Sequence, residues 1–363
     1  MITALTVVVI LVFLVVVHEF GHFLAAKLFG VTVQEFGVGY PPRAFLIATI
    51  GGTEYTINWL PFGGFVRLFG DEGENESGRG SFMGAPRWKQ GVILAAGVAM
   101  NAVAAWGLFA VSLHLGVPQV VDAVPAGEHA QLMVSDVVPA SPADAASIHP
   151  GDEIVSVKDD KQIALADLTP DSMVSFVSER GGVPITITYA RAGVQKTVTL
   201  TPANAVIPGA AGRPALGVAL ALVAMHSSSW PEALIGAYYE TTASLVTVAQ
   251  TLWSIVVSAF HGAPNLSDVI GPVGIVTYVG EASQNGLGSV LLIAALISVN
   301  LVVVNLIPIP ALDGGRLVLL LAEAIRRRKT PKLVVHSLNF IGISLVLMLM
   351  VVVTYHDILR LLA

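Results

Sequence analysis

Four long apolar stretches constrain this chain more than any other feature. They cover roughly residues 2–28, 91–115, 290–322 and 333–353, and the third contains two prolines after Ile307. A helix needs about 20 predominantly apolar residues to cross the hydrocarbon core of a bilayer. Only 12% of the residues are charged, which is about half the share usual in a soluble domain. The sequence therefore predicts a polytopic α-helical membrane protein with four transmembrane helices.

The chain between the second and third stretches is mostly polar. Residues 117–205 alternate apolar and polar side chains between many turn residues, a pattern typical of short strands. We predict a soluble α+β domain of about 90 residues there, which is large enough to fold by itself. The other predicted parts are an N-terminal membrane part (1–116), a linker with an interfacial helix (206–289) and a C-terminal membrane part (290–363).

The segment 231–260 is long enough to span a membrane, but it carries Glu232, Glu240 and Gln250. Lys and Arg accumulate in cytoplasmic loops, and one crossing by this segment would separate the two basic loops of the chain. We therefore predict that it lies at the interface or packs on the soluble domain. Both basic loops are then cytoplasmic, and the 117–205 domain is extracytoplasmic. The basic residues concerned are Arg43, Arg67, Arg79, Arg87 and Lys89, and Arg326, Arg327, Arg328, Lys329 and Lys332.

The first apolar stretch contains the sequence His18-Glu19-Phe20-Gly21-His22. Residues four apart lie on the same face of a helix, so the two imidazoles can bind one zinc ion. Glu19 can then take a proton from a water molecule at the metal. The alternative is a polar set that holds helices together. Ionisable groups at hydrocarbon depth are costly unless they are paired or bind a metal, so we favour the metal site.

A catalytic zinc site needs three protein ligands and a water, and the chain has no cysteine. Asp313 is the only ionisable residue between Glu281 and Arg316. It lies about 22 residues into its stretch and His18 about 17 residues into the first, so the two match in depth. Irregular backbone at such depth is tolerated where it lines a cavity or is buried in protein. We predict Asp313 as the third ligand; the alternative is a cap of the following helix. The helix-breaking residues around it are Pro308, Pro310, Gly314 and Gly315.

These two motifs resemble those of the site-2 protease family, the zinc metalloproteases of regulated intramembrane proteolysis. The sequence is most similar to the bacterial branch that cleaves anti-sigma factors and remnant signal peptides. Residues 18–22 resemble the first family motif, 305–314 its Asn/Pro/Asp-Gly motif, and 271–275 and 36–42 two further family segments. The resemblance implies one Zn²⁺ on His18, His22 and Asp313, with Glu19 as the catalytic base.

The resemblance implies further roles outside the metal ligands. Residues 55–67 resemble the membrane-associated β-hairpin of the family, whose edge adds a strand of substrate; an ordinary cytoplasmic hairpin is the alternative. Asn305 is expected to bind substrate backbone or an oxyanion, or to hold helices together. Asn101 is expected to hold helices together near the site. The candidate hairpin residues are Tyr55, Phe62, Gly63, Gly64 and Phe65.

Residues 137–154 follow the bacterial PDZ pattern, so the inserted extracytoplasmic domain resembles a single PDZ domain that binds a peptide by strand addition. We expect an intramembrane zinc metalloendopeptidase of the inner cell membrane, with its active site toward the cytoplasmic side. Its expected partners are the lipid bilayer, single-pass membrane proteins or signal-peptide remnants, and a peptide ligand, but no nucleic acid. The alternatives are a membrane-anchored PDZ scaffold with a non-catalytic metal site, and a metal transporter. Transporters usually contain inverted repeats, and none is evident here.

Overall fold

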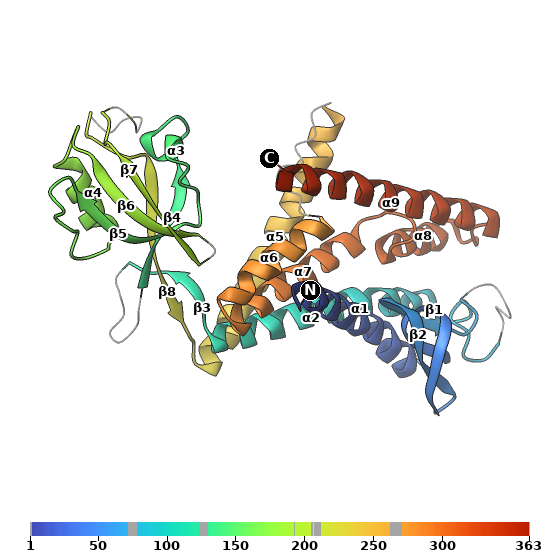
Figure 1. Ribbon diagram of the computed structural model, residues 1–363. Helices are drawn as coiled ribbons and strands as arrows, with labels where there is room; N and C mark the ends of the chain where they lie inside the picture. The colour runs from blue at the N-terminus through green and yellow to red at the C-terminus, as the bar shows by residue number, and fades with distance from the viewer. Residues whose placement is uncertain are drawn as a thin grey trace. The chain divides into compact units, whose positions relative to one another are not determined.

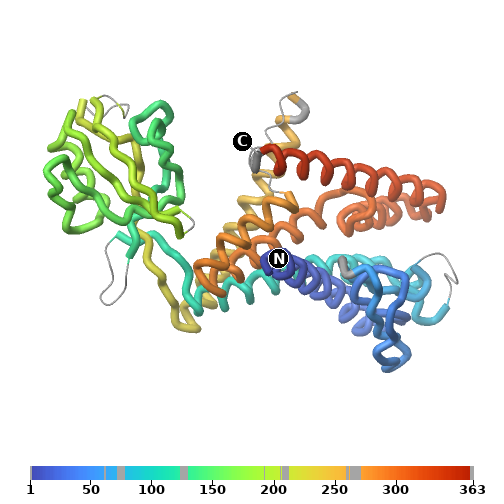
Figure 2. The backbone as a smooth tube through the Cα atoms, viewed as in Figure 1, coloured from blue at the N-terminus to red at the C-terminus, as the bar shows by residue number. Residues whose placement is uncertain are grey.

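The computed structural model describes residues 2–71, 78–122, 130–191, 193–204, 206, 212–261 and 271–362. The chain divides into two compact units (Figures 1 and 2). The helical unit comprises Met1–Leu115 and Ser228–Ala363, and the sheet unit comprises Gly116–Ser227.

Within the described residues, five helices of the helical unit are long and apolar enough to cross a membrane, one more than the four that we predicted. The additional helix is α5, which we expected to be interfacial. The five helices are α1 (Ile2–Leu28), α2 (Arg87–Leu115), α5 (Trp230–Phe260), α7 (Leu287–Leu306) and α9 (Lys332–Leu362).

Helices α5 and α7 both begin beside the C-terminal end of α2. The Trp230 ring of α5 stacks on His114 with centroids 4.1 Å apart. The Ser112 hydroxyl donates a hydrogen bond to the Gly288 carbonyl of α7 at 2.7 Å. The chain between residues 230 and 286 therefore starts and finishes at the same end of α2. If α5 crosses a membrane, α7 still begins on the side where α5 begins, so the basic loops stay on one side.

The course of α5 itself is oblique. Figure 1 shows its second half diverging from α1 and α2. Its buried residues lie in its first half, at Ala233, Ala237 and Thr241, and none of its described residues from 242 to 258 is buried. The second half of α5 thus exposes an apolar surface of the kind that lipid covers.

The third predicted stretch forms two helices, and the break lies where the helix-breaking residues around Asp313 predicted it. Helix α7 ends at Leu306 and the amphipathic helix α8 (Asp313–Arg326) begins seven residues later. Pro308 and Pro310 prevent continuation, because proline lacks the amide donor and its ring clashes with the preceding turn. The chain then folds back closely, since a Cβ on Gly314 would lie 2.4 Å from the carbonyl oxygens of Leu306 and Ile307. A short helix, α6 (Pro272–Gln284), precedes α7.

The strands β1 (Val33–Ile50) and β2 (Thr53–Leu68) form a small antiparallel sheet. Residues 33–38 of β1 pair with 64–68 of β2 on one side and with 54–57 on the other. Each strand therefore contributes two segments, and the segment 64–68 has a strand partner on one side only among the described residues. We predicted a simple hairpin over 55–67. The structure instead contains four paired segments, two from each strand.

A buried carboxylate joins the segments of this sheet. The Glu35 Oε1 atom accepts a hydrogen bond from the Thr56 hydroxyl at 2.8 Å and lies 3.0 Å from an Arg43 nitrogen. The Arg67 Nη1 atom lies 3.3 Å from Glu35 Oε2. A buried charge is costly without such partners, so Glu35 links three segments of the folded sheet.

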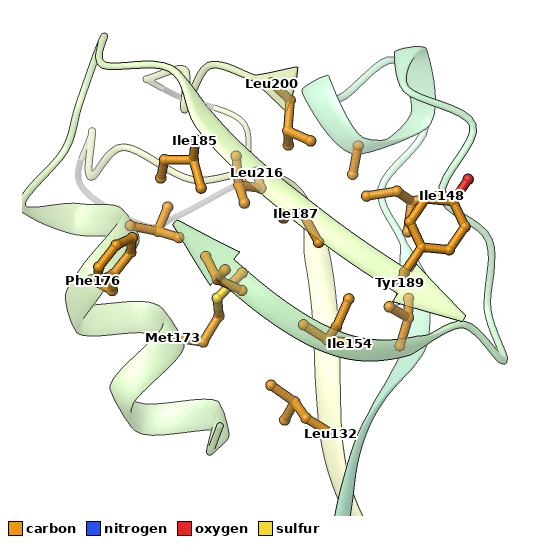
Figure 3. Packing of buried hydrophobic residues seen from close by; sticks show 14 of the residues in the cluster. Leu132, Ile148, Ile154, Met173, Phe176, Ile185, Ile187, Tyr189, Leu200 and Leu216 are labelled. Carbon is orange, nitrogen blue, oxygen red and sulfur yellow. The ribbon is translucent and has the colours of Figure 1, made fainter. Parts of the chain in front are cut away.

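The sheet unit contains a six-stranded sheet in the order β3-β8-β4-β5-β6-β7. Its core lies between this sheet and α4, and it is formed mainly by branched aliphatic side chains (Figure 3). The elements are β3 (Val117–Val120), β4 (Ala130–Val137), α3 (Pro142–Ala145), β5 (Glu153–Asp159), α4 (Pro170–Ser178), β6 (Ile185–Arg191), β7 (Val194–Leu200) and β8 (Val218–His226).

Our predicted boundary at residue 205 is wrong, because the unit extends to Ser227. Residues 218–226, which we assigned to a linker, form β8, and β8 lies between β3 and β4 within the sheet. Val137 pairs with Val218 and Ala130 pairs with Ala224. The pairing joins segments about 80 to 95 residues apart, which a local pattern of polar and apolar residues does not reveal.

Candidate metal centre

Helices α1 and α8 bring His18, His22 and Asp313 together. The Asp313 Oδ2 atom lies 3.0 Å from His18 Nε2 and 3.3 Å from His22 Nε2. The two Nε2 atoms lie 3.2 Å apart. Both imidazoles are buried. Asp313 is the first residue of α8, and its Oδ2 atom, which faces both imidazoles, makes no hydrogen bond to the start of the helix, so a capping role does not explain the position of this oxygen.

These distances suit a zinc ion. Ligand atoms at 2.0–2.2 Å around a tetrahedral zinc are separated by about 3.3–3.6 Å, close to the separations between the three side chains. The Asp313 Oδ2 atom is also buried without a hydrogen-bond partner. Buried carboxylate oxygens without a partner are costly. A metal ion would satisfy this oxygen and both imidazoles at once.

Two glycines let α1 and α2 approach closely enough to build this centre. A Cβ on Gly21 would lie 2.3 Å from the Ala96 carbonyl oxygen of α2. A Cβ on Gly97 would lie 2.3 Å from His22 Nε2 and 2.8 Å from His18 Cε1. Real Cβ atoms do not approach other atoms so closely, so glycine is needed at both positions. The face of α2 that carries Gly97 forms one wall of the site.

The nitrogens of both imidazoles that face away from Asp313 have partners on α2. The His22 Nδ1 atom lies 2.8 Å from the Ile93 carbonyl oxygen. The His18 Nδ1 atom lies 3.2 Å from the Asn101 amide. We expected Asn101 only to hold helices together. A polar side chain deep within the second apolar stretch indicates a buried role for Asn101. Its contact with His18, however, follows from the packing of α1 on α2.

Glu19 lies next to His18 on α1 and beside the small sheet. A Cβ on Gly64 would lie 3.5 Å from Glu19 Cγ, and Gly64 is buried. Gly64 belongs to the edge segment 64–68. The structure thus brings one predicted hairpin residue next to the predicted catalytic base.

The other predicted hairpin residues lie differently. Tyr55 pairs with both Phe36 and Ala48, so it is in an inner segment, and the prediction that it belongs to an exposed edge is wrong. Gly63 lies against the Tyr40 ring, and Phe65 packs over Gly37. The side chain of Phe62 lies outside the described residues.

Asn305 lies in the last turn of α7 and is half-buried. Among the described residues, its side chain makes no hydrogen bond to the three clustered groups. Its neighbours Leu306 and Ile307 lie against Gly314, so the backbone beside Asn305 is close to the start of α8.

An ion pair holds α8 to the chain that follows the small sheet. Arg316, one turn after Asp313, pairs with Asp71. The Arg316 guanidinium also lies 5.9 Å from the centre of the Phe82 ring. These contacts hold the first turn of α8, and therefore Asp313, against the part of the chain that follows α1.

Comparison with known proteins agrees with these observations. Residues 6–349 match the model of peptidase family M50. The chain is 34% identical over 348 residues to a putative zinc metalloprotease of Clostridium perfringens, covering 95% of each chain. It is 32% identical to a putative zinc metalloprotease of Rhizobium meliloti (96% and 94% covered) and 25% identical to zinc metalloprotease RasP of Geobacillus kaustophilus (95% of each).

A solved structure, the PDZ domain of an SdrC-like protein of Listeria monocytogenes, is similar to 28% of this chain and 93% of its own, with 20% identity and a TM-score of 0.20. At that score the likeness decides nothing about the fold of the sheet unit. The family match and the relatives, in contrast, extend over nearly the whole chain. The resemblance inferred from the motifs is confirmed, and the chain belongs to peptidase family M50.

Proposed function

We propose that this chain is an intramembrane zinc metalloendopeptidase that cleaves the transmembrane segments of single-pass proteins. One observation carries the proposal. The two imidazoles of α1 and the carboxylate of α8 offer ligand atoms within 4.8 Å of one another, in helices long enough to cross a membrane or directly next to one. The names of the relatives, zinc metalloproteases, agree with zinc as the cofactor.

The roles of the residues follow from chemistry. His18, His22 and Asp313 would hold the ion, and a zinc ion there would polarise the scissile carbonyl and acidify a water molecule. Glu19 takes the proton from the attacking water and donates it to the departing amine nitrogen. Asn305 is a candidate to bind the developing oxyanion or the substrate backbone.

A helical substrate conceals its peptide bonds, so it must be extended before cleavage. The edge segment 64–68 lies beside Glu19 and has backbone groups that a substrate strand can pair with. We propose that the substrate adds to this edge through Gly64 and Phe65, with Gly63 directly before it. Its backbone would then lie across the metal centre.

We propose that the chain lies in the inner membrane, and the distribution of charge supports one orientation there. The basic loops, including Arg326–Lys329, would be cytoplasmic, the metal centre would lie toward that side, and the sheet unit would be extracytoplasmic. We propose that the sheet unit is a PDZ domain that binds a peptide, and that the substrates include anti-sigma factors or signal-peptide remnants.

Replacing Glu19 with Gln tests the proposal. The variant keeps the size of the side chain but cannot accept the proton, so cleavage of tagged single-pass substrates should fall by about 10²–10⁴-fold. Zinc content of the purified protein should stay unchanged. Glu240→Gln, on the exposed surface of α5, is the matched control and should cleave like the wild type. Equal amounts of product from Glu19→Gln and the wild type would contradict the proposed function.

A further inference from the structure

A neutral imidazole binds a metal through one nitrogen only when its proton is on the other nitrogen. His22 meets this condition through the backbone. Its Nδ1 atom lies 2.8 Å from the Ile93 carbonyl oxygen, and a carbonyl oxygen can only accept. The His22 proton is therefore on Nδ1, and the Nε2 lone pair faces Asp313 and His18.

His18 has a side chain in the corresponding position. Its Nδ1 atom lies 3.2 Å from the amide of Asn101, which is fully buried. In this structure the Asn101 amide nitrogen faces His18 Nδ1, and the Asn101 amide oxygen is buried without a partner. The two orientations of an amide have nearly the same shape, and the hydrogen-bond network decides between them.

The two orientations have opposite consequences for the metal. If the amide nitrogen donates to Nδ1, the His18 proton must be on Nε2, which then has no lone pair for an ion. If the amide is rotated, Nδ1–H donates to the Asn101 oxygen, and the amide nitrogen takes the buried position that the oxygen held. Only this second arrangement leaves the Nε2 atoms of both histidines ready to bind one ion.

We infer that Asn101 is a positioning residue that accepts a hydrogen bond from His18 Nδ1–H and holds His18 in its metal-binding tautomer. The inference rests on the metal centre proposed above. It assigns to one face of α2 the support of both imidazoles, through the Ile93 carbonyl for His22 and the Asn101 amide oxygen for His18. Such outer partners of metal-binding histidines raise the basicity of the ligand and fix its orientation.

Holding α2 to α7 does not need this side chain. The contact of Asn101 with α7 is made by its backbone, because the Ser298 hydroxyl donates to the Asn101 carbonyl oxygen at 2.8 Å. Within the described residues, the amide of Asn101 makes its hydrogen-bond contact with His18 alone. The two roles therefore predict different results for variants of the side chain.

Two substitutions separate an acceptor from a donor and from a packing group. Asn101→Asp keeps an acceptor oxygen and has no amide donor, whereas Asn101→Leu has a similar size and no hydrogen-bonding group. The dissociation constant for zinc is measured on the full chain in detergent by competition with a chelator, together with the unfolding temperature of the zinc-free protein. Asn300→Leu is the control, since among the described residues the Asn300 amide donates a hydrogen bond to the Leu296 carbonyl of its own helix, α7, and to no other group.

Asn101→Leu should weaken zinc binding about 10–100-fold, the usual effect of removing such a partner. Asn101→Asp should bind zinc within about threefold of the wild type or more tightly, and Asn300→Leu should bind zinc like the wild type. Wild-type affinity in Asn101→Leu, or a loss in Asn101→Asp as large as in Asn101→Leu, would overturn the inference. A lower unfolding temperature with unchanged affinity would do the same, because it indicates packing alone.

If Asn101→Leu does not fold, the Asp variant decides by itself, since retained affinity supports an acceptor and lost affinity excludes one. Neither measurement involves a substrate. A failure of the proposed protease function would therefore appear in the Glu19→Gln experiment, and a failure of this inference would appear only in zinc affinity.

Discussion

At the scale of single residues, Gly97 marks the point where α2 comes closest to the two imidazoles. Its missing side chain leaves the space next to His22 Nε2 and His18 Cε1. Helix interiors disfavour glycine by up to about 1 kcal/mol relative to alanine, so the local backbone gains nothing from it. The space that it leaves for the metal centre is the reason that we assign to it.

Gly97→Ala should therefore damage the metal centre while it favours the helix. The new Cβ would lie 2.3 Å from His22 Nε2, so the imidazoles must shift, and we expect zinc affinity to fall at least about tenfold. Chelator competition on the purified protein measures it. Gly107→Ala on the same helix, where a Cβ meets nothing within 4 Å, should bind zinc normally. Unchanged affinity in Gly97→Ala would show that the site has more space than the structure indicates.

In the sheet unit, Asp152 is a buried carboxylate whose charge is stabilised by its hydrogen-bond partners. It is 1% exposed. Its carboxylate accepts two hydrogen bonds from Arg191, each 2.7 Å long, and one from the His149 backbone at 2.9 Å. Burial by itself raises the pKa of the Asp152 carboxyl, but Arg191 and the His149 N–H outweigh it and hold this pKa below its usual range.

Asp152 makes the free energy of unfolding depend on pH in the acid range. Because the folded pKa of Asp152 lies below the unfolded value of about 3.9, the unfolded chain binds more protons between the two values. The contribution of Asp152 is thus complete above the unfolded pKa and is lost as the pH falls through the folded one. Asp152→Asn should lower the free energy of unfolding at pH 7 by about 1.5–3 kcal/mol and should reduce its acid dependence. Urea unfolding of the sheet unit at pH 7 and pH 3 checks this, and an equal loss at both pH values would contradict it.

At the scale of elements, α9 is tied to α6 by one carboxylate. Asp357, which is 3% exposed, accepts hydrogen bonds from the Gly271 N–H at 3.1 Å and the Gly274 N–H at 2.8 Å. These donors belong to the start of α6, where backbone N–H groups lack partners within the helix and the helix dipole favours negative charge. A Cβ on Gly271 would lie 2.6 Å from Asp357 Oδ2, which explains the glycine before Pro272.

Removing this carboxylate should loosen α9 from α6. We expect Asp357→Leu to lower the free energy of unfolding by about 3 kcal/mol, because two buried N–H groups lose their acceptor. Asp357→Asn keeps an acceptor and loses only the charge, so its cost should be about 1 kcal/mol. Thermal unfolding in detergent compares the two with Tyr355→Leu, an exposed position on the same helix. Equal unfolding temperatures for Asp357→Leu and Tyr355→Leu would exclude this role.

At the scale of the whole molecule, the chain leaves the helical unit after Leu115 and re-enters it at Ser228. The sheet unit has its own hydrophobic core, which includes Leu132 of β4, Ile187 of β6 and Leu222 of β8. A core of this kind is what a domain needs to fold by itself.

Residues 116–227 should therefore fold as an isolated fragment with a single cooperative thermal transition. Residues 116–205 should not, because that fragment lacks β8, which pairs with both β3 and β4. Near-UV circular dichroism and amide proton dispersion of the two fragments test this. A cooperative transition of the shorter fragment would restore the boundary that we first predicted.

The parts of this protein that the sequence alone determined are those with local physical causes. Long apolar runs specify membrane helices, a spacing of four puts His18 and His22 on one face, and prolines with glycines break the chain at Asp313. The resemblance to a peptidase family rests on the same short motifs. Helix depth also indicated that Asp313 belongs with the histidines, because equal depth is a property of each helix separately.

The tertiary structure decided what depends on contacts between distant segments. Contacts of this kind leave no local periodicity. They include the place of β8 in the sheet, the edge segment beside Glu19 and the start of α5 and α7 at the same end of α2. The contact between Asn101 and His18 is of the same kind, because it exists only where two glycines let α1 and α2 approach. A sequence pattern specifies which face of an element is buried, whereas packing alone specifies what that face meets.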